Sequence, residues 1–72
     1  MNSIEMTNNA IKIINRPADG SEANKEARRR AAKQLRSDAS EFIKFADMRK
    51  DSSVYSKLIT RANELVAIAE KA

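Results

Sequence analysis

The amino-acid sequence predicts an all-α fold, a compact bundle of three or four short helices, and three observations support it. The only proline and the only glycine, Pro17 and Gly20, fall together in one break at residues 16–21. The 52 residues after Gly20 are rich in residue types that favour helix, such as Ala, Lys, Arg, Glu and Leu. Apolar residues there recur at steps of three and four, which is the period of a helix with one buried face.

The segment before the break, about residues 4–15, has two interpretations. Ile4, Ile11 and Ile14 share one face of a helix, whereas the apolar run that begins at Ile11 also suits a short strand. We favour the helix. Under either interpretation Pro17 disfavours helical backbone at the preceding residue, so the element should end just before the break.

Three further helices are expected after the break, at about residues 22–36, 39–50 and 54–71. Ser21 should cap the first of them, because a serine hydroxyl accepts a hydrogen bond from the free N–H groups at a helix start. Asp38, with a glutamate three residues later, predicts the start of the second helix. The polar run at residues 51–53 separates the second helix from the third.

A chain of 72 residues can build one core, so we expect residues 1–72 to form a single helical domain. Leu, Ile, Val and Phe make up 14 residues, while alanine, which buries little area, contributes 12. Phe42 and Phe45 are therefore expected in the core. Because the core is thin, a homodimer or a bound partner would supply missing buried surface.

The composition argues against an enzyme. The chain has no histidine and no cysteine, which removes the commonest general base and the most nucleophilic side chain. A pair of carboxylates could perform acid and base chemistry, but only in an enclosed pocket that a domain this small hardly provides. A single glycine excludes the glycine-rich loops that bind nucleotide phosphates, so we expect no cofactor. We also expect no metal, since Asp47 and Asp51 lack the dense oxygen spacing of a calcium loop.

The sequence also predicts a cytoplasmic protein without a membrane partner. The lack of cysteine excludes disulfides and fits a reducing compartment. The first residues lack the cationic start and apolar stretch of a signal peptide, and no apolar run approaches the length of a membrane span.

The positive charge of the chain is local. Residues 25–36 contain six cations and one carboxylate, a net charge of +5, whereas the other 60 residues contain eight cations and nine carboxylates and sum to −1. The six cations are Lys25, Arg28, Arg29, Arg30, Lys33 and Arg36. On a helix, four of them form one stripe opposite a seam of small residues and Leu35, with Arg28 and Arg30 at its flanks.

The leading interpretation of this stripe is a nucleic-acid-binding regulator, because clustered cations on a helix gain free energy when they displace counterions from phosphates. The alternative is a protein-binding inhibitor or adaptor, of the kind found in phages and mobile elements, that docks the same cations on an acidic protein surface. The third is an ordinary solvated face, in which glutamates pair weakly with the cations. The sequence alone leaves DNA, RNA and protein open as partners.

Two short segments resemble known nucleic-acid-binding families. The stretch from Arg29 to Gln34 looks like the arginine-rich helix of lambdoid phage antiterminator N proteins, which implies binding to an RNA hairpin. A strand near Ile11, a helix, and a second helix that opens at Ser40 are similar to ribbon-helix-helix DNA-binding dimers, although the turn before Ser40 lacks the glycine common in that family. Neither likeness covers enough of the chain to assign a family.

Overall fold

The computed structural model describes residues 3–50 and 53–72, and this part of the chain forms three helices and no strand. Helix α1 spans Ser3–Asn15, α2 spans Glu22–Asp47 and α3 spans Val54–Ala69. The three helices pack against each other as a small all-α bundle, which confirms the predicted fold class.

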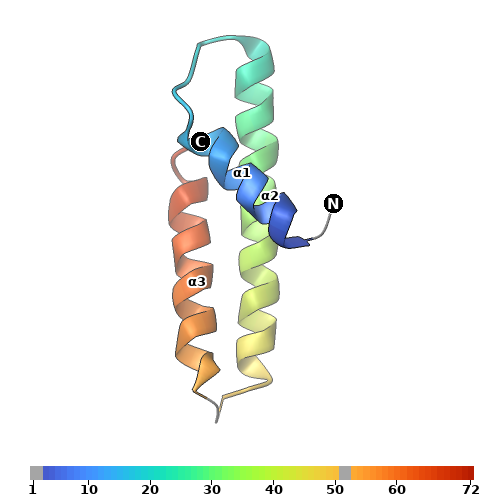
Figure 1. The fold of residues 1–72 in the computed structure, drawn as a ribbon, viewed down its shortest axis with the longest axis vertical. Coiled ribbons are helices and arrows are strands. Elements are labelled where there is room, and N and C mark those ends of the chain that lie inside the picture. Colours follow the sequence, from blue (N-terminus) through green and yellow to red (C-terminus); the bar gives the residue numbers. More distant parts are fainter. Residues whose placement is uncertain (1–2, 51–52) are drawn as a thin grey trace.

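The two longer helices form an elongated antiparallel hairpin, and α1 crosses over it. Figure 1 shows α1 lying obliquely across the middle part of α2, beside the end of α3. The packing of α1 is mainly on α2 and only slightly on α3. The molecule measures 46 × 23 × 14 Å, so the far part of the hairpin extends well beyond α1.

Helix α1 decides between the two interpretations of the N-terminal segment. The backbone is helical to Asn15, so the helix is confirmed and the strand is excluded. The resemblance to ribbon-helix-helix proteins fails for the same reason, because that fold needs a strand here. The helix ends two residues before Pro17, as expected from the steric limits that proline places on its predecessor.

The N-terminal cap of α2 is also confirmed. The Ser21 hydroxyl accepts a hydrogen bond from the backbone N–H of Asn24 at 3.1 Å. It also donates to Asp19 Oδ1 at 2.7 Å, so the same oxygen joins the loop to the helix.

The predicted separation of helices 22–36 and 39–50 is wrong, because α2 continues without a break to Asp47. The side chain of Asp38 does not cap a new helix. It accepts hydrogen bonds from Gln34 Nε2, one turn earlier, at 2.9 Å and from Thr7 Oγ1 of α1 at 2.7 Å. The residue that suggested a helix start therefore fastens α1 to the middle of one long helix. The second helix opening required by the ribbon-helix-helix likeness is absent at Ser40 as well.

The end of the hairpin differs in smaller ways from the prediction. Helix α2 ends three residues earlier than expected and α3 ends two residues earlier. The polar run predicted as a cap for α3 lies partly outside the described residues, and its last member, Ser53, makes no side-chain capping hydrogen bond in the described part of the chain.

The core is built mainly from small residues. Leu35 and Leu65 are the large side chains that are fully buried among the described residues, and the other buried positions are Ile14 and seven alanines. Phe42 is half-buried and packs against this cluster. Phe45 is 51% exposed, so its predicted place in the core is wrong. The core is as thin as the composition predicts, and of the three aromatic residues only Phe42 packs against it in the described part of the chain.

Candidate functional site

The six predicted binding residues all lie in α2 between its start and Arg36, but the structure does not present them as one stripe. They fall into three groups that differ in what the side chains contact. Arg28 lines a groove and hydrogen-bonds to backbone carbonyls at the ends of the helices. Lys25, Arg29 and Arg36 line the same groove, and Arg30 and Lys33 lie outside it.

Arg28 holds the ends of the helices together. Its guanidinium donates to the backbone carbonyl oxygens of Ile14 at 2.6 Å, Arg16 at 3.1 Å and Lys71 at 3.0 Å. These carbonyls come from the end of α1, the loop after it and the turn after α3. A planar guanidinium can serve several acceptors at once because its N–H groups diverge in one plane. Arg28 therefore has a structural function, and its charge forms the inner wall of the adjoining groove.

The groove has a volume of about 410 Å³ and lies between the loop at residues 16–21, the first half of α2 and the end of α3. Besides Arg28, the cations that line it are Lys25, Arg29 and Arg36. Alanine is the commonest residue type in its wall, at positions 18, 32, 69 and 72. Small residues leave space between the helices and the loop, and the cations surround that space. We call this feature the basic groove.

Two of the groove cations form ion pairs on the surface of α2. Lys25 Nζ lies 3.5 Å from Glu22 Oε1, with both side chains largely exposed. Arg29 pairs with Glu26, whose side chain is 39% exposed. Exposed pairs of this kind contribute little free energy, so a stronger anion can replace the carboxylate. Arg36 forms no ion pair with any residue that the structure describes.

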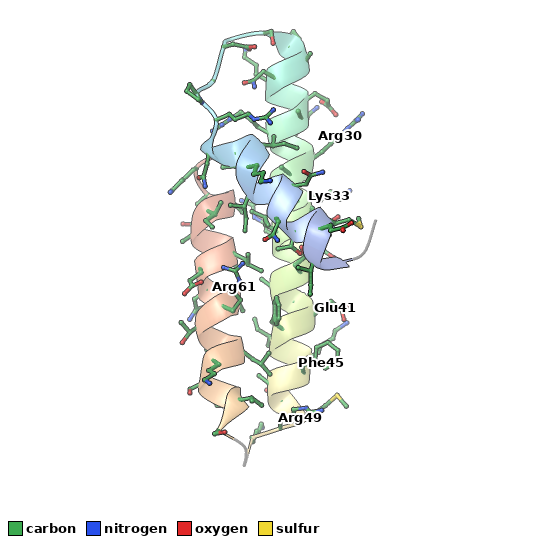
Figure 2. All side chains as sticks on the ribbon, in the orientation of Figure 1. Arg30, Lys33, Glu41, Phe45, Arg49 and Arg61 are labelled. Atoms are coloured by element: carbon green, nitrogen blue, oxygen red, sulfur yellow. The ribbon has the colours of Figure 1, made fainter. Side chains whose placement is uncertain are left out.

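Arg30 and Lys33 lie on a different side of α2. Figure 2 shows both on the side of the helix that is turned away from α3. The side chain of Arg30 is 79% exposed and shares Glu26 with Arg29, at 3.1 Å from Arg30 Nε to Oε1. These two residues belong to an open solvated surface and not to the groove.

The loop beside the groove is shaped by Gly20 and Asp19. Gly20 has a φ of 80°, in the left-handed region that L-residues rarely adopt, so this turn requires glycine. The Asp19 carboxylate accepts the Ser21 backbone N–H at 2.9 Å as well as the Ser21 hydroxyl. These two hydrogen bonds, the one from the backbone first, hold the pKa of Asp19 below its ordinary value of 3.8. The loop thus keeps a fixed shape next to the first turn of α2.

Asn24 is a groove residue that the sequence analysis missed. Its Oδ1 atom is buried and accepts no hydrogen bond from the described residues, although the side chain lines the groove. Buried polar atoms are nearly always paired, so this acceptor is an exception among the described residues. The sequence signal was weak, because asparagine in the first turn of a helix is common.

Residues 3–50 and 53–72 contain no group of three or more His, Cys, Asp or Glu side chains placed to hold a metal ion. None of the helices there has both the length and the apolar character needed to cross a membrane.

No protein family model, curated protein or solved structure matches the chain. The chemistry of the basic groove and of the surface around it therefore carries the inference of function.

Proposed function

We propose that this protein is a small nucleic-acid-binding regulator that places backbone phosphates in the basic groove. The observation that carries the proposal is the convergence of Lys25, Arg29 and Arg36 on one space of about 410 Å³, with the guanidinium of Arg28 in its wall. Several cations around one concave site focus positive potential there more strongly than a flat surface does.

The groove favours phosphate contact over base recognition. Among the described residues, no aromatic side chain lines it, so bases have no ring on which to stack. Two of its cations are exposed arginines, which bind phosphate oxygens with two parallel hydrogen bonds. Binding should therefore depend mainly on the backbone, with little sequence preference.

The proposal also includes the mode of action of the protein and its cellular compartment. We take the protein to act by binding and not by catalysis, which the lack of histidine and cysteine supports. We place it in the cytoplasm, which the lack of cysteine also supports.

A second candidate function is docking on an acidic protein surface, as an inhibitor or adaptor would. The supporting observation is that the groove cations already form ion pairs with carboxylates, Lys25 with Glu22 and Arg29 with Glu26. Carboxylates of a partner could replace them at the same positions. This candidate requires binding that does not depend on nucleic acid.

A salt-titrated binding assay separates the two functions. The purified protein is titrated with duplex DNA, hairpin RNA and a polyglutamate chain at several salt concentrations. Three groove cations predict a slope of roughly −3 for log affinity against log salt on duplex DNA, whereas participation of all six cations predicts roughly −5. A preference for both nucleic acids over polyglutamate supports the proposal. Binding to polyglutamate as tight as to DNA and RNA contradicts it and favours the acidic protein surface.

A further inference from the structure

The C-terminal half of α2 leaves large apolar side chains exposed beyond α1. Phe45 is 51% exposed and Met48 79%, and at the edge of the same region Ile4 of α1 is 73% exposed. Figure 2 shows Phe45 on the side of α2 away from α3, below the point where α1 crosses. We call these three residues the apolar face. By comparison, the large side chains that are fully buried in the described part of the chain are Leu35 and Leu65, so the chain exposes more large apolar side chains here than it fully buries.

A groove of about 610 Å³ adjoins the apolar face. Ile4, Phe42 and Phe45 contribute its apolar lining, and Glu41 and Arg61 contribute charges from α2 and α3. The half-exposed Phe45 ring is thus a projection at the edge of a hollow. A projection and a hollow on one surface are what a two-fold symmetric interface needs, because each copy then fills the hollow of the other.

The charges around this groove also suit a second copy of the same chain. Residues 37–50 contain three carboxylates and three cations and have no net charge, in contrast to the +5 of residues 25–36. Within the chain, Glu41 lies 3.9 Å from Lys44 Nζ and Arg61 lies 3.1 Å from Glu64, so both form only exposed local pairs. A two-fold interface can bring Glu41 of each copy to Arg61 of the other, which forms two equivalent pairs.

Such an interface has to extend beyond the three residues of the apolar face. A stable interface buries about 800 Å² on each partner, which is roughly 15% of the 5292 Å² surface of this chain. Antiparallel pairing of the two apolar faces would direct the basic grooves toward opposite ends of the assembly. The strongly positive segments then stay apart, so their repulsion opposes association only weakly.

We propose that two copies of this chain form a symmetric dimer through the apolar face, with Phe45 of each copy in the groove of the other and Glu41 paired with Arg61 across the interface. The proposal does not depend on nucleic-acid binding, because it uses the opposite half of α2. A chain that stays monomeric in the following measurements would leave this face to a different partner.

The first measurement is the molar mass of the full chain, from sedimentation equilibrium over a concentration series. The wild-type protein is expected to reach twice the monomer mass of 8.1 kDa. The F45D variant should raise the dimer dissociation constant by about 30-fold or more, because it places a charge at the centre of an apolar contact. I43A, on another side of the same helix, should leave it nearly unchanged. A wild-type protein that stays monomeric throughout contradicts the proposal.

The second measurement tests the symmetric charge pair directly. E41K and R61E should each weaken the dimer by about tenfold or more, because each places like charges opposite one another. Mixing the two variants should restore association, since in the mixed dimer the lysine introduced at position 41 faces the glutamate introduced at position 61, and the other pair is native. Neither substitution removes a buried group, so both variants should keep the helical circular dichroism of the wild type. Two folded variants that stay monomeric when mixed, or a dimer that neither substitution weakens, overturn the proposed arrangement.

Discussion

The two halves of α2 have the same backbone and very different surfaces. The N-terminal half, up to Arg36, carries a net charge of +5 over residues 25–36 and borders the basic groove, whereas residues 37–50 are neutral and expose Phe45 and Met48. Charged side chains gather where a loop and the end of α3 enclose a space. Apolar side chains are left exposed where α1 no longer covers the hairpin. One helix can thus serve two different contacts because the elements packed around it change along its length.

Leu35 lies at the end of the N-terminal half, next to its boundary with the other half, and its substitution should have the largest effect on the stability of both. It is fully buried in a core that otherwise consists mainly of alanines, so L35A removes much of the large apolar volume at the centre of the hairpin. We expect the free energy of unfolding to fall by about 3 kcal/mol. Chemical denaturation followed by circular dichroism measures this change.

I43A is the matched control, because Ile43 lies on the same helix and is 43% exposed. It should cost less than about 1 kcal/mol. Equal losses for the two substitutions would mean that the hairpin is not held together at Leu35.

Substitution of Arg28 should cause the next largest loss of stability. It distinguishes a cation that holds the fold together from the cations in the N-terminal half of α2 that are proposed to bind a ligand. R28A removes donors from three backbone carbonyls at the ends of α1 and α3, so the free energy of unfolding should fall by about 2 kcal/mol. R28K should restore little of it, because one ammonium group cannot reach all three acceptors. The measurement is thermal or chemical denaturation.

R30A is the control for this prediction, since Arg30 is 79% exposed and makes only a surface ion pair. It should change stability by less than about 0.5 kcal/mol. If R28A is as harmless as R30A, the hydrogen bonds of Arg28 do not hold the helix ends together.

The sequence predicts the helices well and their continuity less well. Helical periodicity, the Pro17–Gly20 break and the Ser21 cap all correspond to features of the structure. The missing break at Asp38 shows the limit of local signals. A carboxylate that resembles a helix cap forms a tertiary hydrogen bond with Thr7, 31 residues away, and its neighbour Ala39 is buried in the core.

The sequence predicts which cations belong to the candidate site, but it does not predict how their side chains are arranged. The six cations are identified by their cluster, yet only tertiary packing decides that Arg28 faces three carbonyls and that Lys33 lies outside the groove. The contribution of the end of α3 to the groove wall, through Ala69, carries no local signal because alanine occurs on every helix. Phe45 illustrates the same limit, since its apolar character predicts the core and the short α1 leaves it uncovered.

The most direct test of the basic groove compares two charge-reversal variants that have the same net charge. R29E/R36E changes the groove, and R30E/K33E changes the outer side of α2; each double substitution lowers the charge by the same amount and removes one ion pair with Glu26. Affinity for duplex DNA and hairpin RNA is measured at low salt, after circular dichroism has shown that both variants are folded. We expect R29E/R36E to lose at least about tenfold more affinity than R30E/K33E. Equal losses would contradict the groove as the binding site, because they would show that only the total charge of the protein matters.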